Sequence, residues 1–209
     1  MKILPREHGA TVIWFSSILA AVLTMPTLPD PTRLLLFLSV SVSALLFTSY
    51  LTGHSPTLIR IQRNRLFLPI ISGGLTLTTL LGYYIMFEAV SAKILSVWLL
   101  ILTYTVISVS LIQSKVQGLL KRKPSSPKPI LLPGLTVFTA ESLLLYSYGL
   151  MHPATLLSMT PLLFMWLYLQ RPTLPETTES KMKTIRRIGF QQTGNMIAFI
   201  LILTALSRF

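Results

Sequence analysis

The sequence predicts an all-α integral membrane protein with seven transmembrane helices, a cytoplasmic N-terminus and a C-terminus outside. Of its 209 residues, 52% are apolar or aromatic and only 11% are charged, whereas soluble domains carry about 25% charged residues. The mean hydropathy is +0.67. Long apolar stretches recur along the chain, and basic residues gather between alternate stretches. Together these observations indicate a chain surrounded mainly by lipid.

Seven apolar stretches reach the roughly 17–25 residues that a spanning helix needs. They cover 9–26, 33–53, 66–87, 92–113, 130–150, 153–170 and 189–207. Pro161 lies inside the sixth stretch and is expected to kink that helix. The seven helices are expected to form a single bundle over residues 1–209.

The distribution of lysine and arginine sets the orientation. If the N-terminus is inside, the cytoplasmic segments hold all but three of the 18 basic residues. The three exceptions are Arg33, Lys93 and Arg208. Because the alternation holds at every crossing, we expect a multi-pass protein of the plasma membrane.

Two cytoplasmic segments, 114–129 and 171–188, are predicted to be basic loops. The first is rich in proline and lysine, and it should attract anionic headgroups at about 1 kcal/mol per basic residue near the surface. The last part of the second, from about Ser180, is compatible with a short amphipathic helix lying on the membrane.

Composition narrows the range of chemistry open to the chain. The chain has no cysteine, so it offers no disulfide, thiolate or iron–sulfur ligand. A net charge of +12 can indicate nucleic-acid binding, but here the basic residues lie in separate loops. We therefore expect anionic lipids as partners, with partner subunits as a further option, and no nucleic acid.

Polar side chains collect at the predicted cytoplasmic ends of the helices. The stretch PREHGA precedes helix one, a basic segment follows helix two, and RRIGFQQTGN opens helix seven. The candidate ligand-binding residues are Arg6, Glu7, His8, His54, Arg60, Arg63, Gln191 and Asn195. Capping of helix one by Glu7 and contact of Arg6 with lipid phosphate explain part of this pattern. Interface anchors and a binding pocket both remain open.

Glu141 lies near the middle of the fifth predicted helix. A charged acid there costs on the order of 2.5–3.5 kcal/mol. No basic residue is predicted at that depth, so the carboxyl should be protonated or hydrogen-bonded to Ser142, Thr139 or a tyrosine such as Tyr104. Glu141 has two possible roles. It either forms a structural interhelical hydrogen bond, worth about 0.6 kcal/mol, or it relays protons or binds a ligand.

No cofactor is expected. His8 and His54 are predicted on the cytoplasmic side, whereas His152 is predicted outside. No two histidines share a helix face, which excludes the paired axial ligands of a dihaem bundle. A haem or metal held by His8 and His54 is the remaining option, although no carboxylate supports it.

The stretch KILPREHGA, leading straight into helix one, resembles the YwiC-like family of small bacterial and archaeal membrane proteins. The basic loop after helix two and the RRIGF entry to the last helix are also similar. That family has no established activity. The resemblance implies that Arg6, Glu7, His8 and Gly9 belong to a shared element, which favours a site there.

The loops after helices two and six occupy the places of the functional loops of UbiA-type prenyltransferases. Those loops carry aspartate-rich motifs that hold magnesium against a diphosphate. Here TGHSPTLIRIQRNR contains no acid, and the second loop has only Glu176 and Glu179. The magnesium ligand set is therefore missing, and the chain is two helices short of that fold.

Three functions remain. The first is a non-catalytic membrane component or small subunit whose cytoplasmic cluster binds lipid or a partner. The second is an enzyme acting on an isoprenoid or lipid substrate near His8, Glu7 and Arg60–Arg65. The third is a small proton-coupled transporter centred on Glu141. The sparse inventory of redox, metal-binding and nucleophilic groups favours the first.

Overall fold

The structure, a computed structural model, describes residues 30–39, 42, 76–77, 80–85, 87–88, 90–121, 128–170 and 178–207. Every regular element in these ranges is a helix, which confirms the all-α class for this part of the chain. The main elements are α5 (Ala92–Lys121), α6 (Lys128–Ser147), the 3₁₀ helix η1 (Pro153–Met159), α7 (Thr160–Leu169) and α8 (Thr178–Ser207).

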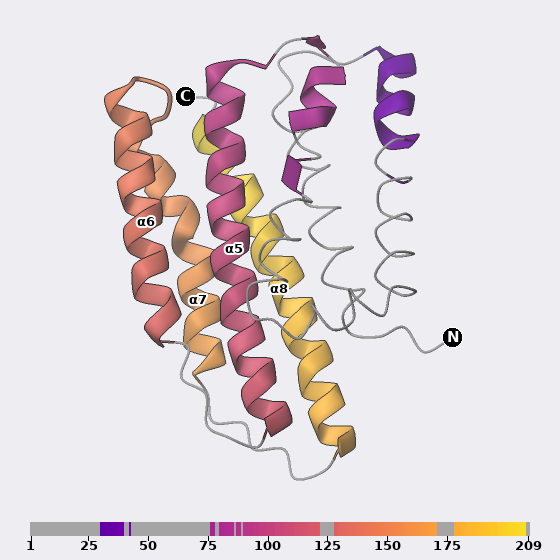
Figure 1. Ribbon diagram of the computed structural model, residues 1–209, viewed down its shortest axis with the longest axis vertical. Coiled ribbons are helices and arrows are strands. Elements are labelled where there is room, and N and C mark those ends of the chain that lie inside the picture. The colour runs from indigo at the N-terminus through magenta and orange to yellow at the C-terminus, as the bar shows by residue number, and fades with distance from the viewer. Residues whose placement is uncertain are drawn as a thin grey trace, which may run out of the picture.

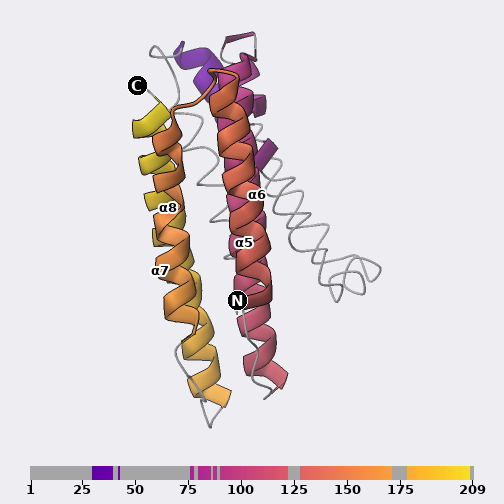
Figure 2. The ribbon, with the colours of Figure 1, turned by 90° about the vertical axis from the view of Figure 1, so that its left-hand side faces the viewer.

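These elements form an antiparallel bundle in which α5, α6, the contiguous segment η1–α7 and α8 run in alternating directions (Figure 1). Helix α5 packs against α6 and α8, while η1 and α7 close the bundle against α8. The pairs α5–α6 and α7–α8 run side by side (Figure 2). A buried core of leucine, isoleucine, phenylalanine and methionine side chains joins all of them.

Two helices in the described part of the chain are long and apolar enough to cross a membrane. They are Ala92–Val116 in α5 and Lys183–Leu206 in α8. The apolar segments Leu131–Ser147 and Pro153–Leu169 are shorter. The total of seven spans and the orientation of the termini stay predictions.

Helix α5 continues to Lys121, through the first half of the segment predicted as a loop at 114–129. Its 30 residues span about 45 Å, which exceeds the roughly 30 Å of a bilayer's hydrocarbon core. The extension is helical because Leu119 is buried against the core and no proline occurs before Pro124.

Helix α8 begins at Thr178, eleven residues before the predicted start at 189. The segment from Ser180 is helical, but it forms the first turns of α8 and not a separate surface helix. Ile185 and Ile188 explain this continuity, because both pack against the bundle core. Hydropathy alone places the start of this helix just after the last charged residue, whereas packing against the bundle determines where the helix begins.

Pro161, where the sequence predicts a kink, lies next to a change of helix type. The predicted sixth helix divides into η1 and α7, and Pro161 lies in the first turn of α7. A proline there loses no helical hydrogen bond, because the first amide groups of a helix have no intrahelical acceptor. Pro153 begins η1 in the same way. The chain thus changes from a 3₁₀ to an α helix directly before Pro161.

Close contacts tie neighbouring helices together. A Cβ atom on Gly134 of α6 would lie 2.8–3.0 Å from side-chain atoms of Ile107 on α5, so α5 and α6 approach closely at this point. Nearer the N-terminus, a Cβ atom on Gly82 would overlap the ring of Phe37. Arg33 and Glu88 form an exposed ion pair with a 2.6 Å N–O distance.

Candidate functional site

Only part of the predicted site falls within the described residues. Gln191, Asn195 and Glu141 lie on α8 and α6. The others lie outside the described residues: Arg6, Glu7, His8, His54, Arg60 and Arg63. Convergence of all these side chains at one rim of the bundle therefore stays a prediction, and so does a haem or metal at His8 and His54.

Asn195 lies deeper in the bundle than its predicted position at a helix entrance. Because α8 starts at Thr178, Asn195 falls in the middle of the segment Lys183–Leu206. Its backbone carbonyl accepts a hydrogen bond from the Tyr104 hydroxyl at 3.3 Å. Its side-chain Nδ2 is buried and has no hydrogen-bond partner among the described residues. Gln191, one turn earlier, is half-buried.

An aromatic cluster joins three helices at this depth. Tyr104 of α5 is fully buried and stacks on Phe199 of α8, with ring centroids 3.8 Å apart and planes 12° apart. Phe138 of α6 meets Phe199 edge-on at 6.3 Å. Sequence reasoning missed this cluster, since aromatic residues are too common in apolar helices to be singled out by composition.

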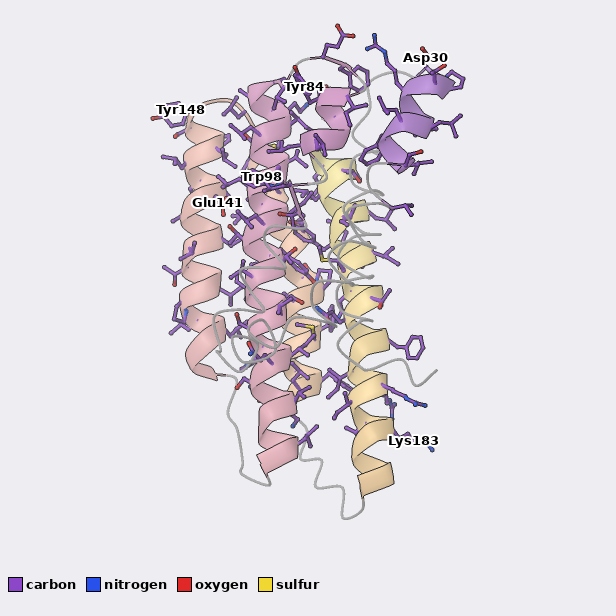
Figure 3. All side chains as sticks on the ribbon, turned by 45° about the vertical axis from the view of Figure 1, so that its right-hand side comes forward. Asp30, Tyr84, Trp98, Glu141, Tyr148 and Lys183 are labelled. Atoms are coloured by element: carbon purple, nitrogen blue, oxygen red, sulfur yellow. The ribbon has the colours of Figure 1, made fainter. Side chains whose placement is uncertain are left out.

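Glu141 lies on α6, and its side chain lies between α6 and α5 (Figure 3). The Thr103 hydroxyl of α5 is close to the carboxyl group. However, neither carboxyl oxygen has a hydrogen bond of acceptable geometry to a described residue, and both oxygens are buried. Thr103 is near the centre of Ala92–Val116, so the acid lies at mid-depth beside α5.

None of the three predicted hydrogen-bond partners, Ser142, Thr139 and Tyr104, bonds the Glu141 carboxyl. The Ser142 hydroxyl is buried without a partner among the described residues, because consecutive side chains on a helix point about 100° apart. The Tyr104 hydroxyl donates to Asn195, since stacking on Phe199 turns the ring toward α8. Thr139 is exposed.

Several buried polar atoms on α5, α6, α7 and α8 lack partners within the described residues. We call the five residues that carry them the mid-bundle polar layer: Thr105, Glu141, Ser142, Trp166 and Asn195. They come from α5, α6, α7 and α8. The Ser108–Met165 contact at 3.9 Å brings α7 to the same region of α5.

The side-chain polar atoms of the mid-bundle polar layer form no hydrogen bonds with the described protein atoms. Buried polar groups in proteins are normally hydrogen-bonded, and each unpaired one costs about 1–3 kcal/mol. Water, a proton or a polar ligand would satisfy such groups. A metal is a poor fit, because no three His, Asp or Glu side chains gather anywhere in the described ranges.

Charge separates the two ends of the bundle. Lys183, Arg186 and Arg187 are exposed near the start of α8. Asp30 and Tyr148 lie at the opposite end from Lys183 (Figure 3). Among the residues that the structure describes, one end is therefore basic, and the other carries charges of both signs: Asp30, Lys93 and the Arg33–Glu88 pair.

The outward faces of α6 and α7 are apolar. Leu132 is 72% exposed, Leu144 is 56% exposed and Phe164 is 64% exposed. Val137 and Leu167 are exposed as well. Soluble monomers rarely present apolar side chains in such density, whereas lipid-facing helices do so as a rule.

Comparison of the sequence with protein-family models, with curated proteins and with solved structures gave no match. Function is therefore inferred from the residues and from their geometry.

Proposed function

We propose that this chain is a multi-pass plasma-membrane protein with seven helices, an N-terminus in the cytoplasm and a C-terminus outside. The separation of charge carries this proposal. Lys183, Arg186 and Arg187 lie at a predicted cytoplasmic helix end, and the Arg33–Glu88 pair lies at predicted outer ends. The two helices of spanning length and the apolar outward faces support it.

Within that membrane setting, the chain acts as a non-catalytic component or small subunit of a membrane assembly. Its cytoplasmic cluster, built around His8 and Arg63, binds anionic lipid or a partner. Membership of the YwiC-like family is part of the same proposal and rests on KILPREHGA and RRIGF. The sparse inventory of nucleophilic, metal-binding and redox groups supports a binding role.

Native mass spectrometry of the gently solubilised protein tests this role. We expect a bound subunit or lipid at fixed stoichiometry, and we expect it to be lost from the His8→Ala/Arg63→Ala variant. Loss follows because both side chains belong to the proposed binding cluster. A Lys93→Ala variant, altered at the opposite end of the bundle, should retain the bound species. A bare monomer, or equal retention by all three proteins, contradicts the proposal.

A second function, proton-coupled transport, is favoured by Glu141. Its two carboxyl oxygens are buried at mid-depth without a partner among the described residues. A carboxyl group in that position can take up and release a proton within the membrane. The other unpaired atoms of the mid-bundle polar layer offer hydrogen bonds to a water molecule. Such a water would pass the proton to or from the Glu141 carboxyl.

Glu141→Gln is expected to abolish proton influx into vesicles that hold the purified protein. The amide keeps the size of the side chain but has no acidic group that ionises near neutral pH. Influx is measured with an internal pH-sensitive dye while a potassium gradient sets the membrane potential. Glu88→Gln, at the exposed ion pair, is the matched control and should leave influx unchanged. Equal influx through the Glu141→Gln variant and the wild type makes Glu141 structural.

A further inference from the structure

One face of α8 changes character along its length. Lys183, Arg186, Arg187 and Phe190 follow the spacing i, i+3, i+4 and i+7, which places them in one row on the helix surface. All four side chains are exposed, and Phe190 is 77% exposed. The row passes from three cations to an apolar ring within about one turn, or 5.4 Å, of helix.

The same row continues as an apolar track. Gly194 is exposed, Ile197 is half-buried and Leu201 is 49% exposed. A Cβ atom added to Gly189 or Gly194 would meet nothing within 4 Å. The missing side chains leave open space at these two positions of α8, which flank Phe190 in the sequence.

The basic part of the row is held by a neighbouring helix. The guanidinium carbon of Arg187 lies 5.9 Å from the ring centroid of Tyr168, near the end of α7. A cation over an aromatic ring at this distance is attracted to it. Arg187 is therefore oriented before any ligand arrives, and Arg186 lies next to it on the exposed side.

We propose that this row binds one anionic phospholipid of the cytoplasmic leaflet. Lys183, Arg186 and Arg187 hold the headgroup phosphate, and an acyl chain lies along Phe190, Gly194 and Leu201. Arginine suits the phosphate because its planar guanidinium can donate two parallel hydrogen bonds. The inference adds a lipid site separate from the cluster around His8 and Arg63, and it rests on the membrane placement in the proposed function.

The apolar track decides the class of ligand. A soluble phosphate or an acidic protein matches the three cations but leaves Phe190 and Leu201 without a partner. A phospholipid carries a negative headgroup and an apolar chain joined end to end, in the order in which α8 presents its two surfaces. The switch between Arg187 and Phe190 then marks the boundary between headgroups and hydrocarbon.

The charge part of the site is tested in phosphatidylcholine nanodiscs containing phosphatidylglycerol. We expect native mass spectra of the released wild-type protein to retain phosphatidylglycerol over phosphatidylcholine. Arg186→Gln/Arg187→Gln should weaken that retention about thirty-fold, because each basic residue near the surface contributes about a factor of five. Arg33→Gln/Lys93→Gln removes the same charge at the opposite end and should retain the lipid as the wild type does.

The track is tested with the cations intact. Gly194→Leu should reduce phosphatidylglycerol retention, because its side chain fills the open space, whereas Ala140→Leu on the exposed face of α6 should not. Soluble glycerol phosphate should fail to displace the lipid. Displacement by glycerol phosphate, equal retention by the two double variants, or no effect of Gly194→Leu overturns the inference.

The same samples separate this inference from the proposed function. If the wild type enters nanodiscs but shows no preference for phosphatidylglycerol, the α8 site is wrong and the membrane placement stands. If the wild type does not enter these nanodiscs, the membrane placement fails, and the lipid site fails with it.

Discussion

Replacing Tyr104 with alanine is expected to destabilise the bundle by about 3–5 kcal/mol, the cost of truncating a large buried aromatic side chain. Tyr104 is fully buried, it stacks on Phe199, and its hydroxyl bonds the backbone of Asn195. Its loss leaves a cavity between α5 and α8 and removes the hydrogen bond to the Asn195 carbonyl, which keeps its place in the hydrogen-bond ladder of α8. Unfolding of the purified protein in mild detergent, followed by circular dichroism, measures the change.

Tyr104→Phe separates the ring from the hydroxyl. The phenylalanine ring keeps the stack on Phe199 and loses only the hydrogen bond to Asn195. Interhelical hydrogen bonds in membranes average about 0.6 kcal/mol, so this variant should stay close to the wild type. An alanine variant as stable as the phenylalanine variant would show that the aromatic cluster does not hold α5 and α8 together.

Replacing Gly134 with leucine is expected to cost roughly 1–3 kcal/mol, toward the upper end of the range for overpacked sites. Even the first side-chain atom would lie 2.8–3.0 Å from side-chain atoms of Ile107, so either the Ile107 side chain or the two helices must shift. The better helix propensity of leucine offsets less than about 1 kcal/mol of this. The same unfolding measurement reports the change.

A second substitution makes the interpretation specific. Ile107→Ala alone should destabilise by about 2–5 kcal/mol through its cavity, yet combined with Gly134→Leu it should restore part of the stability. Coupling between contacting residues of this kind is about 0.5–3 kcal/mol. Gly194→Leu, where a Cβ atom meets nothing within 4 Å, is the control and should change little. Additive losses at positions 107 and 134 would disprove the close contact.

Much of the described fold is predictable from apolar length. The helical segments that follow Ala92 fall near the predicted spans 92–113, 130–150, 153–170 and 189–207. The boundaries differ where packing extends a helix beyond its apolar part, as Leu119 does in α5 and Ile185 does in α8. Hydropathy detects the apolar part of a helix. It does not detect packing contacts that the polar ends of the same helix make with the bundle.

The candidate site was only partly predictable, for a different physical reason. Sequence shows that Glu141 is costly in a membrane helix, and its carboxyl oxygens are buried as that cost implies. The partner could not be predicted, because it depends on how α5 and α6 are rotated about their axes. The same rotation decides that Tyr104 faces Asn195. For His8, His54 and Arg63, the prediction awaits a structural test.

The membrane-spanning arrangement is tested most directly by labelling, since the chain contains no cysteine. Single cysteines are introduced at Tyr148, Val137 and Lys183, all of which have exposed side chains. In intact cells, a membrane-impermeant maleimide should label position 148 only. Permeabilised cells should add position 183, while position 137 stays unlabelled in lipid. Labelling of position 183 in intact cells, or of position 137 before detergent is added, would contradict the proposed membrane-spanning bundle and its orientation.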